Sequence, residues 1–419
     1  MVLPRQRASV FGEEETMDEI ARGYLEVTLS LDRHVPGFVD AYFGPPEIKA
    51  GLDAAPPRPL DALAAQTAGL LAALEAEGAA PQRKDYLAAQ LRAIQVVIAK
   101  AGGQALDFVT EVERTFDITP AMVDKSTFAA AHAEMDRVLP GRGPLRERLE
   151  DWKKSQELAP DRVLPVFELA MAETRRRTLD LYDLPPRENL SLQVVENQPW
   201  SAYNWYLGDY QSRIELNNDL PLRASSAVRL LAHEAYAGHH TEHAIKEQKL
   251  YRDQGRAEHA VQLLLAPECV LSEGIADSAR EILFDDQALV SFLGDVLYPA
   301  AGLPGFDVER QVRLDRAAEG LRGVSGNAAL LLHRERRPME EVQAYVERWG
   351  LSTAKEASQT LKFIQTPLYR AYIFNYAMGK DLLAPLLAGP RARENFGRLL
   401  AEALTPGGVR RWIAQEQAF

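Results

Sequence analysis

The stretch Leu231–His240 constrains this chain more than any other, because it holds three of the eight histidines and a glutamate directly after the first of them. On a continuous α-helix His239 would face about 120° away from His233. His240 would face the same way as His233 but lie roughly 10.5 Å further along the axis. Two of these rings can therefore act on one ligand only if the helix breaks between them, and Gly238 favours such a break.

A second set of polar residues follows further along the chain, where Glu273 and Asp277 are spaced four apart on a predicted helix. Residues at this spacing share one helical face. Imidazole nitrogen and carboxylate oxygen are ligands that zinc prefers, and a catalytic zinc keeps one position open for water. We therefore predict a metal site that combines His233, Glu273 and either His239 or His240. Asp277 is expected to accept a hydrogen bond from the far ring nitrogen of a ligand histidine and so fix its tautomer.

Glu234 directly follows the first histidine and is placed to act as the general base that takes a proton from a metal-activated water. A rival arrangement stays open, because His239 and His243 are also four residues apart and can bind a metal by themselves. We expect His243 at the surface instead. The simplest alternative without any metal is a polar helix whose histidines only cap it or lie exposed.

Apolar residues repeat with helical spacing through most of the chain. The first helix is expected to begin at a capping Thr16. After residue 222 the predicted helices are 225–249, 257–266, 268–284, 309–322, 338–349, 368–387 and 391–403. The segment 188–221 instead alternates apolar and polar residues between turn signals, which predicts three antiparallel strands in sequence order.

The predicted fold class is therefore mainly α, with two lobes and one small antiparallel sheet next to the helix that carries His233. Residues 1–185 are expected to form an N-terminal helical lobe. Residues 186–419 would form the lobe that contains the sheet and the site, although both parts can also belong to one continuous domain. The residues leave the oligomeric state undetermined.

Composition excludes several partners. The chain has 48 basic and 60 acidic residues and a formal net charge of −12, which argues against a nucleic-acid partner. The single cysteine, Cys269, is expected to be a packed thiol in a reducing compartment. No window approaches the roughly 20 apolar residues of a membrane-spanning helix, and the first residues lack the apolar core of a signal peptide. We therefore expect a cytoplasmic protein without a membrane partner.

The segments His233–His240 and Ser272–Asp277 together resemble the gluzincin zinc peptidases, which include thermolysin-like enzymes and oligopeptidases. More closely, the pattern His-Glu-x-x-x-Gly-His-His is similar to that of a family of bacterial proteins known only as a domain of unknown function. This similarity extends over most of the chain, including residues 35–45 and 367–379.

The resemblance implies a metallopeptidase-like fold with one zinc ion bound by His233, His239 and Glu273 and with Glu234 as the base. Oligopeptidases often have glycine immediately before the second ligand, which favours His239 over His240. The extra residues before that glycine are a departure from the usual pattern and leave the second ligand open between these two. Another divalent ion can take the place of zinc, because the order of affinities alone does not select it.

Gluzincins also hold the substrate backbone along a sheet edge and stabilise the oxyanion with a polar side chain. The predicted strand 210–216 is correctly placed in the sequence for the first role. For the second role the resemblance points to Tyr376, with Tyr372 and Arg370 as substrate-binding neighbours. Packing of Tyr376 in an aromatic core is an equally good interpretation.

The predicted function is hydrolysis of peptide bonds in short peptides by a zinc-dependent enzyme. One alternative keeps the metal but replaces the peptide with a non-peptide amide or ester, because the same activated water serves both reactions. Another is a non-catalytic helical binding protein with a vestigial site. Neither exo- versus endo-action nor side-chain preference follows from the sequence.

Overall fold

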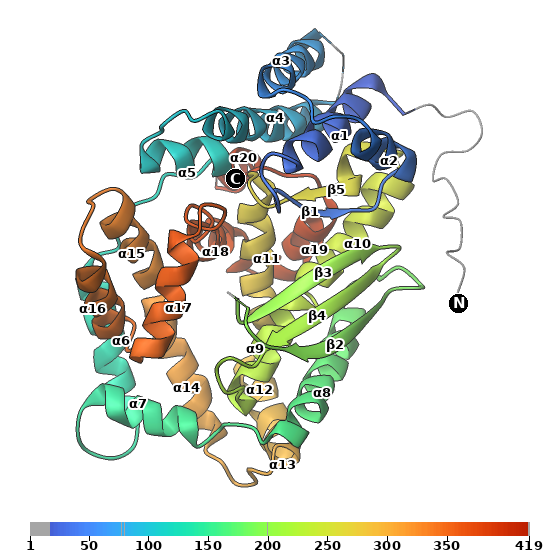
Figure 1. The fold of residues 1–419 in the computed structure, drawn as a ribbon. Coiled ribbons are helices and arrows are strands. Elements are labelled where there is room, and N and C mark those ends of the chain that lie inside the picture. The colour runs from blue at the N-terminus through green and yellow to red at the C-terminus, as the bar shows by residue number, and fades with distance from the viewer. Residues whose placement is uncertain (1–16, 77, 79, 199, 418–419) are drawn as a thin grey trace.

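The computed structural model describes residues 17–76, 78, 80–198 and 200–417. Within these ranges the chain is mainly helical, as predicted, and five short strands form two small sheets (Figure 1). Thr16 lies outside the described residues, and the side chain of Asp18 caps the first helix by accepting a 2.7 Å hydrogen bond from the amide of Ala21.

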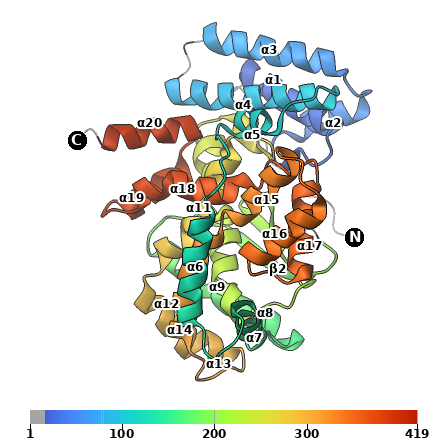
Figure 2. The ribbon, with the colours of Figure 1, turned by 90° about the vertical axis from the view of Figure 1, so that its left-hand side faces the viewer.

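The helices of the first part of the chain pack on one another and on a helix of the second part. At the top of Figure 1, α1 (Glu19–Asp32), α3 (Leu60–Ala76), α4 (Pro81–Ala101) and α5 (Phe108–Phe116) pack on one another. Figure 2 shows α6 (Lys125–Val138) alongside α14 (Val308–Ala318), although these helices are far apart in sequence. The further helices before the site are α2 (Pro46–Ala54), α7 (Leu145–Lys154) and α8 (Pro160–Leu179).

The second half of the chain contributes most of the remaining helices, with π-helical turns at Glu247–Arg252 and Leu293–Leu297 and 3-10 turns at Ala257–Ala260 and Glu319–Leu321. The predicted helix 368–387 begins later than expected, at Phe374, because the preceding residues form turns. The other helices of this half are α12 (Asp286–Phe292), α13 (Tyr298–Ala300), α15 (Val324–His333), α16 (Met339–Trp349), α17 (Ala354–Gln365), α19 (Ala392–Ala401) and α20 (Pro406–Glu416).

The three-stranded sheet contains β2 (Asn189–Val195), β3 (Ala202–Gly208) and β4 (Gln211–Asn217) in the order β2–β4–β3. β3 and β4 form an antiparallel hairpin, whereas β2 and β4 are parallel. The predicted antiparallel meander is therefore wrong. Alternation of apolar residues sets which side chains share a face, but not which strands are neighbours. Because β4 lies in the middle, β3 is an edge strand.

A second sheet was not predicted. It pairs β1 (Val39–Tyr42) with β5 (Val261–Leu263) in antiparallel register, and β1 also lies beside β3 (Figure 1). The helix predicted over 257–266 is wrong, because the chain forms a 3-10 turn followed by β5. A short apolar run fits a buried strand as well as a helix, and its periodicity alone does not separate the two.

Four helices surround the site: α9 (Ala224–Glu234), α10 (His239–Lys246), α11 (Glu268–Leu283) and α18 (Phe374–Leu387). α11 packs closely on α18 because Gly274 and Gly379 face each other at the crossing. A Cβ added to Gly379 would lie 2.2 Å from the carbonyl oxygen of Val270. Glycine at these positions therefore allows the backbones to approach, which brings the residues around α18 next to Glu273 on α11.

Buried apolar residues form two large clusters, and each draws on both predicted lobes. One cluster joins α1, α4 and α5 to β5 and α15, and the other joins α8 to α9, α11 and α19. The division at residues 185 and 186 stays a prediction. Among the described residues, no helix is both long enough and apolar enough to span a membrane.

Candidate metal centre

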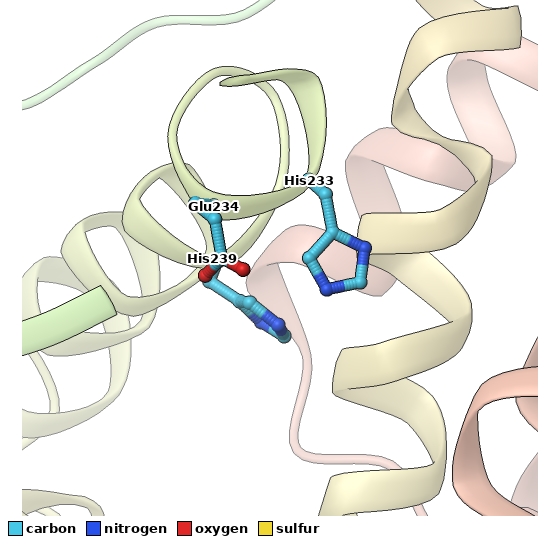
Figure 3. A group of neighbouring side chains, drawn as sticks. All are labelled: His233, Glu234 and His239. Carbon is cyan, nitrogen blue, oxygen red and sulfur yellow. The ribbon is translucent and has the colours of Figure 1, made fainter. Parts of the chain in front are cut away.

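The predicted break in the helix is present, because residues 235–238 separate α9 from α10. Gly238 folds the chain back so tightly that an added Cβ would lie 1.8 Å from the carbonyl oxygen of His233. No larger residue fits at this distance. The rings of His233 and His239 consequently meet with centroids 4.8 Å apart and planes perpendicular (Figure 3).

Glu273 on α11 completes a convergence of three side chains. Its Oε2 lies 3.3 Å from Nε2 of His233 and 3.8 Å from Nε2 of His239. The other ring nitrogen of His233, Nδ1, lies 3.0 Å from Oδ1 of Asp277 and donates a hydrogen bond to it. Asp277 thereby assigns the proton of the neutral imidazole to Nδ1 and leaves the lone pair of Nε2 directed at Glu273.

His239 is fixed in the same tautomer by a second relay. The hydroxyl of Ser272 donates a 2.6 Å hydrogen bond to Glu242, so its oxygen accepts from Nδ1 of His239 at 3.0 Å. A hydroxyl has only one proton to donate, and this assignment follows from the network. Nε2 of His239 is then also a lone-pair nitrogen. The sequence did not reveal this relay, since serine and glutamate at these positions have many other uses.

The buried oxygen between the two rings lacks a donor. Oε1 of Glu273 accepts a 2.6 Å hydrogen bond from Tyr372, but no described residue donates one to Oε2. Two lone-pair nitrogens and an ionised oxygen that face one another repel unless a positive charge lies between them. The ligand atoms of His233, Glu234 and His239 also all lie within 4.8 Å of one another. These donors fit a divalent metal ion of the kind that nitrogen and oxygen ligands select.

The pKa shifts of the two histidines and of Glu273 also favour a positive charge between them. Burial alone would lower the pKa of His233 and His239, but the neighbouring carboxylates raise it above the ordinary imidazole value. Burial alone would raise the pKa of Glu273, but the two rings hold it below its usual range. The cluster therefore attracts positive charge to its centre, and protons compete with a metal ion for it.

Glu234 has a different environment. Burial raises its pKa above the ordinary value, although the two imidazoles oppose this. No described side chain forms a hydrogen bond with its carboxylate, whereas its backbone oxygen accepts a 2.6 Å hydrogen bond from Nδ2 of Asn204 on β3. The free carboxylate suits an acid–base role better than that of a fixed ligand.

The nominated residues near α18 divide into two groups. Tyr372 holds Glu273, and the ring of Tyr376 stacks near that of His233 with centroids 6.4 Å apart. Arg370 instead forms an ion pair with the buried carboxylate of Glu111 and does not line the site cavity. Its assignment to substrate binding stays a prediction, and Lys100 is a second cationic partner of the same carboxylate.

His240 and His243 also differ from one another. His240 is fully buried and turned away from the centre, with Nε2 3.0 Å from Glu188 and Nδ1 2.8 Å from Ser212. His243 was expected at the surface, yet it is half-buried and its ring lies parallel to that of His239 with centroids 5.9 Å apart. α10 packs on both β3 and α11, which leaves little of its surface exposed.

A cavity of about 120 Å³ opens beside the convergent side chains. Its walls come from β1, β3 and β5, from α9, α10, α11 and α17, and from the residues around α18. The strand expected to hold a substrate, 210–216, is the central strand β4, and the edge strand β3 lines the cavity instead. Cys269 also lines it, with its thiol directed at the carbonyl oxygens of Leu263 and Leu264.

No family model and no curated protein sequence matches this chain. Among solved structures, a "putative lipoprotein" from Colwellia psychrerythraea aligns with a TM-score of 0.52 and 12% identity, over 85% of this chain and 70% of that one. A second such protein, of unknown function, from Shewanella oneidensis aligns with a TM-score of 0.48 and 13% identity, over 85% of this chain and 72% of that one. Metallocarboxypeptidase 1 of Trypanosoma cruzi aligns with a TM-score of 0.38 and 14% identity, over 96% of this chain and 100% of that one. At these identities the first similarity supports the fold alone.

Proposed function

We propose that this protein is a zinc-dependent hydrolase that cleaves peptide bonds in short peptides, with His233, His239 and Glu273 as the metal ligands. The observation that carries the proposal is the buried Oε2 of Glu273, which faces two ring nitrogens and has no donor among the described residues. A zinc ion bound there would polarise a carbonyl group and lower the pKa of water.

Glu234 is the proposed general base. Its carboxylate lies within the 4.8 Å group of ligand atoms and has no competing hydrogen bond from a described side chain. Because burial raises the pKa of Glu234, the side chain can accept a proton from water and then release it to the leaving amine. A carboxylate held by strong donors would release its proton too readily for the second step.

Tyr376 is the proposed donor to the negative oxygen that develops during hydrolysis. It lines the cavity, and burial and the neighbouring carboxylates raise its pKa well above the ordinary value. The phenol therefore keeps its proton and can donate a hydrogen bond to an oxyanion. Tyr372 has a different role, because its hydroxyl fixes Glu273.

The edge strand β3 is the proposed support for the substrate backbone. Among the described strands only β4 pairs with β3, although β1 lies beside it, and Ala202 and Tyr203 line the cavity. An extended peptide can pair with such an edge by main-chain hydrogen bonds. The small volume of the cavity, about 120 Å³, favours short peptides.

The first test measures the metal and the base separately. Purified protein is expected to contain one zinc per chain and to lose activity on a panel of short peptides after treatment with a chelator. Glu234→Gln should keep the zinc and lower kcat by about 100-fold or more, the range expected for a general base. Glu281→Gln, on the exposed part of α11, is the matched control and should change neither quantity.

Full peptidase activity in Glu234→Gln, or purified protein without stoichiometric metal, would contradict the proposal. If the protein retains zinc but hydrolyses esters or non-peptide amides and no peptides, the same residues would act on the alternative substrate class.

A further inference from the structure

The cavity beside the proposed metal ligands is strongly acidic. One lysine and no arginine line it. Nζ of Lys246 lies 2.7 Å from Glu242 and 3.1 Å from Glu268, so its charge is already neutralised. The lining contains six carboxylates: Asp40, Glu234, Glu242, Glu247, Glu268 and Glu273. Even with a divalent ion bound, negative charge would remain, and the carboxylate end of a peptide would find no free side-chain cation among the described residues of this wall.

Among the carboxylates that line this wall, Asp40 has neither a described lysine or arginine partner nor a role at the proposed centre. Tyr203 donates a hydrogen bond to its Oδ1, but no described lysine or arginine forms an ion pair with it. Glu247, by contrast, is held by Tyr206 and Arg252. Asp40 therefore has a negative charge to share with a ligand.

Asn204 supplies a second acceptor. Its side chain is only 7% exposed, and Nδ2 donates to the backbone oxygen of Glu234, which fixes the orientation of the amide. Its Oδ1 is therefore not part of this contact. It is a buried acceptor to which no described residue donates a hydrogen bond. A buried carbonyl oxygen without a donor is costly, so a ligand that brings an N–H group would stabilise this arrangement.

Gln262 supplies a third acceptor. Its Oε1 is buried without a donor among the residues that the structure describes, and it lines the same cavity. It belongs to β5 and pairs in register with Ala41, the residue after Asp40. Because β1 also lies beside β3, the three acceptors belong to adjacent strands (Figure 1).

From this wall we infer that the substrate carries a protonated amine, which Asp40, Asn204 and Gln262 bind through their oxygens. This inference rests on the proposed function, because it places the amine beside the bond to be cleaved. An ammonium group has three N–H donors and no acceptor, which matches a wall of oxygen acceptors that carries a negative charge. The amine can be the α-amine of a peptide or the side chain of a basic residue.

The test measures binding rather than turnover. Zinc-loaded Glu234→Gln is titrated calorimetrically with Ala-Ala-amide and with its N-acetylated form. The free amine should bind roughly thirtyfold more tightly or better, the range for a buried charge pair. Asp40→Asn should remove this preference, because it keeps the shape and the contact with Tyr203 but loses the charge. Asp53→Asn, in an exposed ion pair with Lys49, should leave it unchanged.

Equal affinity for the two peptides, or a preference that persists in Asp40→Asn, would overturn the inference. N-acetyl-Lys-Ala-amide distinguishes the source of the amine, because tight binding assigns it to the side chain and weak binding to the α-amine. If Asp40→Asn unfolds, Gln262→Leu at a half-buried position provides the second variant and should weaken binding of the free amine alone. Failure of the hydrolase proposal looks different: the amine preference would be present while wild-type protein cleaves no peptide.

Discussion

At the scale of single residues, the candidate centre depends on which nitrogen of each imidazole keeps its proton. Asp277 and Ser272 each occupy Nδ1 of one histidine, and both Nε2 atoms are left to face Glu273. A ligand histidine whose far nitrogen is hydrogen-bonded has a fixed ring orientation and a more basic free nitrogen. The partners therefore contribute to metal affinity together with the ligands.

We predict that Asp277→Ala lowers zinc affinity by about 10- to 100-fold without unfolding the protein. The side chain of Asp277 is partly exposed, so its removal leaves no buried charge behind. Competition with a fluorescent chelator measures the affinity, and Glu281→Gln on the same helix is the control. An unchanged affinity in Asp277→Ala would contradict the proposed role of Asp277 in orienting His233.

At the scale of secondary-structure elements, the decisive feature is the interruption between α9 and α10. Gly238 allows it through a close approach to the end of α9, where a Cβ would lie 1.8 Å from the carbonyl oxygen of His233 and 2.5 Å from that of Ala232. Backbone atoms cannot move aside as the end of a flexible side chain can. The separation of the two imidazoles is therefore set by one residue that has no side chain.

We predict that Gly238→Ala lowers the free energy of unfolding by about 3 kcal/mol, because the added methyl group overlaps the backbone. It should also abolish stoichiometric zinc binding. Urea denaturation monitored by circular dichroism measures the first quantity and metal analysis the second. Gly69→Ala is the matched control: nothing lies near its Cβ in α3, so the exchange should stabilise the helix by about 0.5–1 kcal/mol. Normal stability and zinc content in Gly238→Ala would contradict the proposed role of the break.

At the scale of the whole molecule, residues far apart in sequence hold the site together. Glu188, which precedes β2, contacts Tyr236 in the break, His240 on α10 and Arg175 on α8. Burial alone would raise the pKa of Glu188, but hydrogen bonds from these three partners lower it from 4.5 to about 2. The ionised form is thus favoured by folding, so this carboxylate couples the global stability to pH.

The sign of that coupling gives a prediction. Because the pKa of Glu188 is lowered on folding, its contribution is fully present above pH 4.5 and is lost as the pH falls through about 2. The contribution is on the order of 3 kcal/mol. Glu188→Gln should therefore be less stable than wild type at pH 6, and the difference should shrink on acidification toward pH 2. Urea denaturation at several pH values measures it. A difference that does not depend on pH would assign the effect to packing alone.

The site pattern was largely predictable because it is local. If His233 and His239 share one ligand, their spacing requires a broken helix, and the spacing of Glu273 and Asp277 predicts a helix with both carboxylates on one face. Both elements are present. Helical geometry relates residues a few positions apart directly to one another.

Only the tertiary structure decided which residues from distant segments contact the candidate site residues. The order of the strands, the pairing of β1 with β5, the turn of His240 toward Glu188 and the ion pair of Arg370 with Glu111 all join segments that are distant in sequence. Packing and burial determine these contacts, and no local spacing encodes them. The sequence by itself thus determined which side chains are candidates for a metal site and left His239 and His240 as alternatives. The packing of distant elements decided which of them point inward and what surrounds them.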